Sequence, residues 1–131
     1  MQIRVYYEDT DLGGVVYHAN YLKFCERARS EAFFKRDLLP HNEQGHFFIK
    51  DLYANYLKSA KLGDLLEVTS TLIEIKSASF KLHQEVLKEG VKLFEMDITI
   101  VHVNAQSNIK KFSKEQKEFL CELFKENSPQ H

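Results

Sequence analysis

Three carboxylates and one histidine lie within eleven residues near the start of the chain, and these side chains are the best suited to chemistry. Glu8, Asp9 and Asp11 precede a glycine pair, and His18 follows it. A carboxylate can activate water as a general base or attack a carbonyl carbon as a nucleophile. Beside backbone N–H donors it suits acyl transfer, because such donors stabilise a developing oxyanion. A plain loop with acidic caps explains the same residues equally well.

The elements on either side of this stretch are a predicted strand and a predicted helix. β-Branched and aromatic residues predict a strand at the start of the chain, through Ile3, Val5, Tyr6 and Tyr7. Apolar spacing predicts a helix that begins at about Asn20 and ends near Asp37, ahead of Pro40. The first N–H groups of a helix have no intrahelical acceptor and carry partial positive charge. The acidic loop is therefore expected beside free donors.

The middle of the chain is predicted to form four further strands. Their expected ranges are His46–Lys58, Leu65–Lys76, Ser79–Leu87 and Val91–Val103. The connections between them are short, which favours antiparallel neighbours along the chain, and Glu89-Gly90 predicts a hairpin turn. One strand, a long helix and four antiparallel strands indicate the α+β class, in which the helix covers the apolar face of the sheet.

The chain is predicted to end in a second helix. Ser113 and Gln116 form a capping box that begins this helix, which is expected over about residues 113–126 and stops at Asn127, Ser128 and Pro129. No internal repeat or linker interrupts the sequence, so residues 1–131 are expected to form one domain.

Composition excludes several classes of protein. The net charge is −1, whereas a dedicated nucleic-acid binder would be markedly basic. No apolar run approaches the ~18 residues of a membrane span, and the first residues are typical of a strand, not a signal peptide. The two cysteines, Cys25 and Cys121, form no CxxC pair, which favours a reducing compartment. These observations predict a cytoplasmic protein that does not span a membrane.

Two segments of the sequence carry a resemblance to a known family. Residues 6–21 read YYEDTDLGGVVYHANY, and residues 26–29 read ERAR. This pattern resembles the hotdog-fold acyl-CoA thioesterases, above all the Tol–Pal-associated YbgC branch, which is related to the 4-hydroxybenzoyl-CoA thioesterases. Weaker similarity continues through SAKLGD, residues 59–64, to about Val103. The resemblance implies a five-stranded antiparallel sheet wrapped around a long central helix, followed by a C-terminal helix.

The resemblance also assigns roles to single residues. It implies that Asp11 is the catalytic acid, as base or nucleophile, and that the backbone N–H of His18 polarises the thioester carbonyl. Tyr7 is a further catalytic candidate if its hydroxyl orients the carbonyl or the water, and a core aromatic otherwise. Glu8 and Asp9 are competing acids. Strand alternation would place Glu8 and Tyr7 on opposite faces, so that only one of them lines the site.

Coenzyme A carries phosphates, so basic and hydroxyl side chains are expected where it binds. Two clusters are candidates, and their members are Lys58, Ser59 and Lys61 in one and Lys76, Ser77 and Ser79 in the other. The family places phosphate contacts near the second cluster. No separate cofactor is expected, because coenzyme A would be part of the substrate.

Other chemistries find no support in the sequence. There is no HExxH or CxxC pair, so no metal site is expected. No G-x-S-x-G motif is present, and Cys25 lies on the apolar stripe of the predicted helix, which favours a buried thiol over a nucleophile.

Three functions follow as hypotheses. The first is an acyl-CoA thioester hydrolase, with acyl carrier protein as an alternative acyl donor. The second is a hydratase or dehydratase of the same fold, which would need a His/Asp pair in a different setting. The third is a non-catalytic module that binds partners in envelope or lipid-synthesis machinery. The resemblance further implies a homodimer or homotetramer, with sheets joined edge to edge and active sites at the interface.

Overall fold

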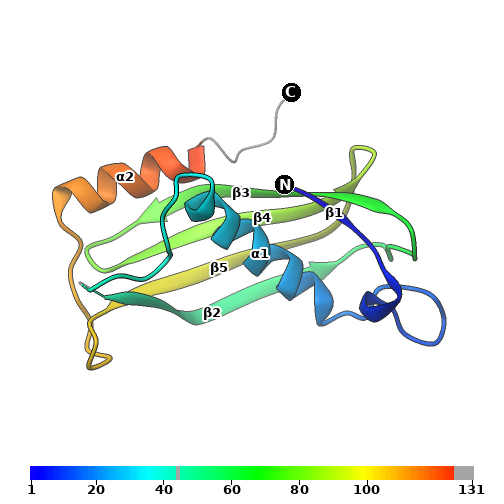
Figure 1. Cartoon of the computed structure of the whole chain (residues 1–131), viewed down its shortest axis with the longest axis horizontal. Helices are drawn as coiled ribbons and strands as arrows, with labels where there is room; N and C mark the ends of the chain where they lie inside the picture. Colours follow the sequence, from blue (N-terminus) through cyan, green and yellow to red (C-terminus); the bar gives the residue numbers. More distant parts are fainter. Residues whose placement is uncertain (44, 126–131) are drawn as a thin grey trace.

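A single antiparallel sheet with a long helix across one face makes up the chain (Figure 1). The computed structural model describes residues 1–43 and 45–125. A second helix, α2, packs beside β3 and α1. The α+β class and the hotdog arrangement of sheet and central helix are thereby confirmed.

The bounds of the elements are close to those predicted. The strands are β1 Gln2–Arg4, β2 His46–Tyr56, β3 Leu65–Ile75, β4 Ser79–Lys88 and β5 Val91–Val103. The helices are α1 Asn20–Phe34 and α2 Lys114–Lys125. The capping box at the start of α2 is confirmed: the Ser113 N–H donates to Gln116 Oε1 at 2.8 Å, and the Gln116 N–H donates to Ser113 Oγ at 3.1 Å. The predicted end at residues 126–129 lies outside the described residues.

The order of strands differs from the expectation of neighbours along the chain. The sheet runs β1-β3-β4-β5-β2, so β2 and β3 are not adjacent. The open edge of β3 is taken by β1, with Gln2 opposite Glu67, and β2 pairs instead with β5 at the other side of the sheet. Residues 57–64 therefore cross one end of the sheet. Short connections elsewhere, from β3 to β4 and from β4 to β5, do join antiparallel neighbours as predicted.

Two predicted boundaries are wrong for local reasons. The first strand ends at Arg4, and Tyr7–Asp9 form a 3₁₀ turn in which the Asp9 N–H donates to the Tyr6 carbonyl at 3.0 Å. The first helix ends at Phe34 and not near Asp37. Asp37 has the left-handed φ of 57°, and the N–H of Leu38 turns back to the Phe33 carbonyl at 3.1 Å, which terminates the helix.

The core lies between α1 and one face of the sheet. The rows of β4 and β5 that face α1 are buried, and they consist of Phe80, Leu82, Gln84, Val86, Phe94, Met96, Ile98 and Ile100. The face of α1 that meets them includes Ala28 and Ala32, whose small side chains let the helix approach the sheet closely. Each fully buried large aliphatic or aromatic side chain contributes about 1.5–3 kcal/mol, so this layer holds the fold together.

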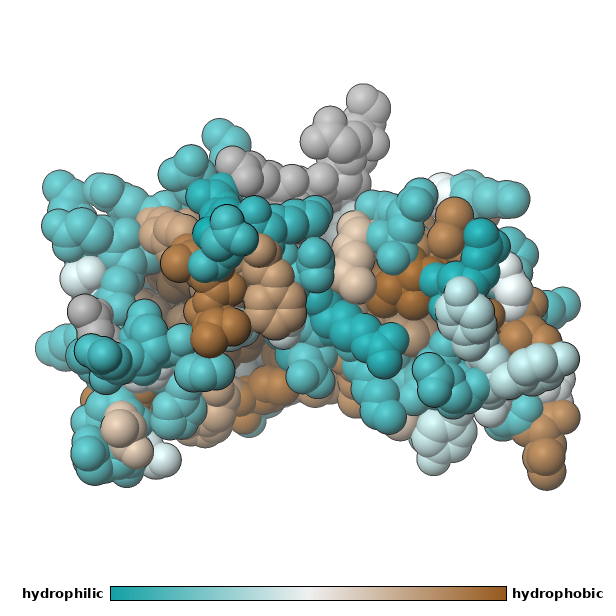
Figure 2. Space-filling model, in the orientation of Figure 1, coloured by the Kyte–Doolittle hydropathy of each residue, from teal (hydrophilic) through white to brown (hydrophobic). Residues whose placement is uncertain are grey.

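The surface on the α1 side mixes hydrophilic side chains with separate apolar patches (Figure 2). Exposed aromatic and aliphatic side chains include Phe48, Ile49 and Tyr53 of β2. Within the described residues, no helix is both long enough and apolar enough to cross a membrane.

The hairpin between β4 and β5 generates a stability prediction. Glu89 and Gly90 both have positive φ, 49° and 81°, as a type I′ turn requires. Glutamate is strained there, whereas asparagine tolerates this conformation. Glu89→Asn should raise the free energy of unfolding by about 0.5–1 kcal/mol, measured by urea denaturation. Glu122→Asn, at an exposed helical position, is the control and should give no gain. A gain of the same size in both variants would contradict the explanation.

Candidate active site

Asp11 lies in a tight loop that its own groups hold closed. Its N–H donates to the Val15 carbonyl at 2.9 Å, and its carbonyl accepts the Gly14 N–H at 3.1 Å. Its carboxylate Oδ1 accepts the Gly13 N–H at 2.8 Å. Gly14 has φ of 79°, and a Cβ on Gly13 would lie 3.3 Å from Asp11 Oδ1. The glycines thus permit a turn that presents the Asp11 carboxylate at the surface.

Asp9 is the internal anchor of this segment. It is buried, and its Oδ2 accepts the Tyr6 N–H at 3.0 Å. Its backbone carbonyl accepts the Tyr17 N–H at 3.0 Å and the Asn20 side-chain amide at 2.8 Å. Asp9 therefore joins the segment that follows β1, the loop and the first residue of α1. This carboxylate has a structural task, whereas that of Asp11 faces outward.

The segment that crosses the end of the sheet supports the loop from beneath. The Ala60 carbonyl accepts the Val16 N–H at 2.9 Å, and the Ala60 N–H donates to the Tyr21 hydroxyl at 2.9 Å. Val15 forms a bridge with Lys61. Ala60 is fully buried between them. This contact explains why the SAKLGD segment, far from Asp11 in sequence, belongs to the same site.

His18 lies at the start of α1, two residues before the first helical residue. Its side chain is exposed, and its backbone carbonyl accepts the Tyr56 hydroxyl at 3.0 Å. Within the described part of the chain, its backbone N–H has no hydrogen-bond acceptor. A free N–H at a helix start is the geometry required of an oxyanion donor. Asp11 and His18 share one loop, but no hydrogen bond joins them.

Contrary to the sequence prediction, Tyr7 and Glu8 do not lie on a strand. Both belong to the 3₁₀ turn, so the argument from alternating strand faces was wrong. The Tyr7 side chain is 80% exposed, which rules out a core aromatic within this chain. No contact links its hydroxyl to Asp11 among the described residues. The catalytic role of Tyr7 stays a prediction.

The two candidate clusters for coenzyme A lie at opposite ends of the sheet. Lys58 and Ser59 follow β2 next to the loop of Asp11, close to Ala60. Lys76 and Ser77 lie between β3 and β4, and Ser79 is the first residue of β4, at the end where β5 finishes. The Lys76 ammonium is 3.4 Å from Glu74 in an exposed ion pair. One copy of the chain therefore does not bring the second cluster to Asp11, and both clusters remain predictions.

Comparison with known proteins places this geometry in a family. A family model described as the thioesterase-like superfamily matches residues 5–120. The chain belongs to the thioesterase-like superfamily. The chain is 54% identical over 86 residues to the acyl-CoA thioesterase YbgC of Helicobacter pylori, and the match covers 66% of this chain and 65% of that protein. This is just under two thirds of the relative's length.

Further thioesterase relatives extend the match. The acyl-CoA thioesterase YbgC of Haemophilus influenzae is 41% identical over 106 residues, which cover 78% of each chain. The crystal structure of a probable thioesterase from Bartonella henselae superimposes with a TM-score of 0.80 at 28% identity, covering 86% of this chain and 97% of that one. The fold of this chain is thus shared with the solved structure of a probable thioesterase.

A buried polar network holds the central helix of this thioesterase-like chain on its sheet. The Gln84 side chain is fully buried, and its Nε2 donates to the Cys25 carbonyl at 2.9 Å and to Ser70 Oγ at 2.8 Å. Its Oε1 accepts Arg29 Nη1 at 2.9 Å. Burial lowers the pKa of Arg29, and burial raises the pKa of the Cys25 thiol to about 12. The expectation that Cys25 is a buried thiol is confirmed.

A cavity opens between α1 and β2, further along the helix from His18. Its volume is about 350 Å³. Arg29 and Ser30 of α1 and Ile49 of β2 line its sides, and Phe80 and Ile100 are also in its wall. A largely apolar wall with a few polar groups is typical of a small-molecule site.

Sequence reasoning missed the residues that position the site. Asn20, Tyr21 and Tyr56 hold the loop and the start of α1, and none was singled out. A tyrosine or asparagine within a helix or strand carries no local signal of such a contact. The partners lie 11, 39 and 38 residues away, so the contacts become visible only in the folded chain.

Replacing Asp9 should lower the stability of the fold, whereas replacing its neighbour Glu8 should not. Asp9→Ala removes the acceptor of the Tyr6 N–H and should lower the free energy of unfolding by about 1–3 kcal/mol in urea denaturation. Asp9→Asn keeps an acceptor oxygen and should lose less. Glu8→Ala, a neighbouring exposed position, is the control and should be close to wild type. An Asp9→Ala protein of unchanged stability would refute the structural role.

Proposed function

We propose that this chain is an acyl-CoA thioester hydrolase, with Asp11 and the backbone N–H of His18 as its catalytic groups. The observation that carries the proposal is the free His18 N–H at the start of α1, on the same loop as an exposed carboxylate. The relatives named acyl-CoA thioesterases support the substrate class. Acyl carrier protein is a second acyl donor, because it presents the same thioester.

The chemistry can follow either of two routes. As a general base, Asp11 takes a proton from water, and the oxygen of that water attacks the thioester carbon. As a nucleophile, an Asp11 oxygen attacks the carbon to give a mixed anhydride, which water then hydrolyses. In both routes the carbonyl oxygen gains negative charge and accepts a hydrogen bond from the His18 N–H, and the coenzyme A thiolate leaves when the tetrahedral intermediate collapses.

The acyl tail is assigned to the cavity between α1 and β2. Glu26, the first cavity residue along α1, lies eight residues after His18, which is roughly 12 Å along a helix. A thioester carbonyl at the His18 N–H therefore points its tail toward the cavity if the tail follows α1. Arg29, whose Nη1 donates to Gln84 Oε1, offers a cation in the wall.

The active unit is proposed to be at least a homodimer. Strand β2 is eleven residues long, forms an edge of the sheet, and exposes apolar side chains. Long apolar edges are normally paired or covered. Antiparallel pairing of two β2 strands about a twofold axis places the start of one beside the end of the other. The Lys76–Ser79 turn of a second copy then lies at the same end as Asp11, where it can bind coenzyme A phosphates. A tetramer would pair two such dimers.

The cellular location is proposed to be the cytoplasm, where acyl-CoA is made and used. Both cysteines are free, and the exposed Cys121 fits a reducing compartment.

Hydrolysis tests the catalytic assignment. Wild-type protein should release thiol from acyl-CoAs in a screen of graded chain length. Asp11→Asn should lose about 10² to 10⁴ in rate, because it can neither accept a proton nor attack. His18→Ala keeps its backbone N–H and should lose less than Asp11→Asn. Glu8→Gln is the matched control and should stay near wild type. Near-wild-type turnover of Asp11→Asn would end the assignment, and partner binding without turnover would favour a non-catalytic module.

The assembly can be tested by light scattering at the assay concentration. Tyr53 is 77% exposed on the edge strand, and Tyr53→Glu should dissociate the assembly and abolish activity, because two like charges would meet at the pairing edge. Ile109→Glu, 72% exposed and outside the strands, is the control and should change neither mass nor rate. A fully active species with the mass of one 15.4 kDa chain would refute the dimer.

A further inference from the structure

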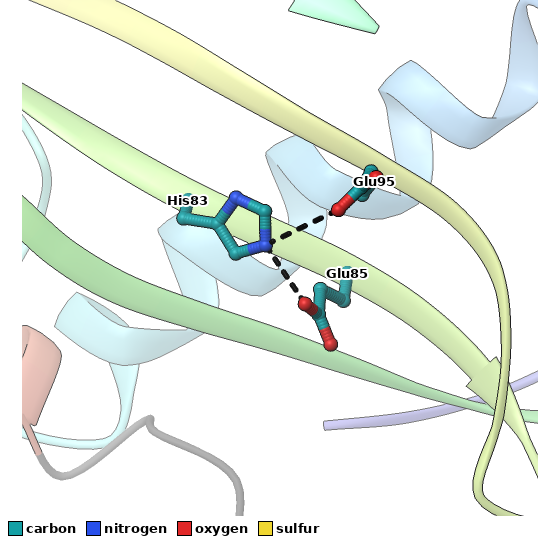
Figure 3. Close-up of side chains that lie close together, drawn as sticks. All are labelled: His83, Glu85 and Glu95. Atoms are coloured by element: carbon teal, nitrogen blue, oxygen red, sulfur yellow. Dashed lines mark hydrogen bonds and ion pairs between the residues drawn. The ribbon is translucent and has the colours of Figure 1, made fainter. Parts of the chain in front are cut away.

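A cluster of charged side chains lies on β4 and β5. The imidazole of His83 and the carboxylates of Glu85 and Glu95 point toward one another (Figure 3). One ligand atom from each lies within 4.8 Å of the others. His83 Nε2 is 2.8 Å from Glu85 Oε2 and 3.7 Å from Glu95 Oε1. All three side chains are partly buried.

Strand register brings these residues together. Glu85 lies directly opposite Glu95, and His83 lies directly opposite Asp97. Along each strand they alternate with buried residues of the core, such as Gln84 and Met96. The cluster is therefore on the face of the sheet that points away from α1 and the proposed active site. Because the backbone ladder fixes all four positions, the cluster is held by rigid elements.

The orientation of the His83 ring is set by Asp97. Asp97 Oδ1 lies 2.8 Å from His83 Nδ1, so the second ring nitrogen points at the two glutamates. In metal sites, a ligating histidine commonly donates its other N–H to a carboxylate, which fixes the tautomer and the ring plane. The chain thus has three ligand atoms together with the outer carboxylate that orients one of them.

The charges of the cluster favour a cation. Like charges directly opposite each other on paired strands are destabilising, and Glu85 and Glu95 are such a pair. The Lys92 ammonium lies 3.1 Å from each glutamate and partly compensates for them. Three carboxylates around a single ammonium leave a negative potential at this position.

We propose that His83 Nε2, Glu85 and Glu95 bind one divalent transition-metal ion of the zinc class, with water in the remaining position. One imidazole with two carboxylates suits such an ion, whereas calcium and magnesium prefer oxygen ligands alone. When the metal is absent, the Lys92 ammonium neutralises part of the charge of Glu85 and Glu95. Its side chain is 38% exposed and long, so its ammonium can move into solvent. The ion would clamp β4 to β5, independently of thioester hydrolysis.

Calorimetric titration of the full chain with Zn²⁺ tests this site. The protein is first treated with chelator and carries Cys121→Ser, which removes an exposed thiol that could bind zinc. One ion should bind per chain. His83→Ala and Glu95→Gln should each weaken binding at least about tenfold, and Asp97→Ala should weaken it by about 10- to 100-fold. His41→Ala, an exposed histidine elsewhere, is the matched control and should not change the affinity.

Lys92→Met is the decisive variant, because it keeps the bulk of the side chain and removes the competing ammonium. It should bind Zn²⁺ more tightly than wild type, and zinc should raise its unfolding midpoint in urea. Co²⁺ in place of Zn²⁺ should give visible absorption that disappears in His83→Ala. Binding that His83→Ala leaves unchanged would overturn the proposal. So would a Lys92→Met protein with no gain in affinity, since the cluster would then be an ion-pair network alone. Circular dichroism confirms that each variant is folded.

Discussion

The buried amide of Gln84 fixes how the central helix lies on the sheet. It is fully enclosed between β4 and α1, where an unpaired amide would cost about 1–3 kcal/mol. Its hydrogen bonds to the Cys25 carbonyl, Ser70 and Arg29 remove that cost in only one placement of the helix. Large apolar side chains of α1 such as Phe24 and Phe33 pack on the same face, but they make no directional contact like that of the amide. One polar group therefore sets the position that the apolar layer stabilises.

The placement of the helix decides the geometry of the loop in front of it. Tyr21, on the first turn of α1, stacks on Phe94 of β5 and accepts the Ala60 N–H. Asn20 reaches back to the carbonyl of Asp9. The loop that presents Asp11 is thus attached by hydrogen bonds to the start of α1 and to the segment that crosses the end of the sheet. Its rigidity comes from buried neighbours, while the Asp11 carboxylate and the His18 N–H stay available to a ligand.

Local patterns in the sequence predicted much of this fold. The features that depend on pairing between distant segments could not be predicted in this way. The bounds of β5, the Glu89-Gly90 hairpin and the Ser113 capping box were all predictable, because each depends on residues within a few positions. The place of β2 in the sheet was not predictable, because the residues of β2 do not indicate which of the two open edges it pairs with. Aromatic residues at Tyr6 and Tyr7 favoured a strand, but the Asp9 carboxylate stabilises a turn there. The proximity of His83 and Glu95 across two strands cannot be read from the sequence without the strand register.

The two thiols of the chain differ in whether a reagent can reach them in the folded state. Cys25 has no exposed surface and lies on the face of α1 that packs on the sheet, whereas Cys121 is exposed on α2. A thiol must ionise and meet its reagent before it reacts, and burial opposes both at Cys25. Alkylation of Cys121 therefore proceeds in the native state, while alkylation of Cys25 waits for α1 to lift from the sheet. The ratio of the Cys25 alkylation rate to the Cys121 alkylation rate therefore measures how often α1 opens, and Cys121 is the internal reference.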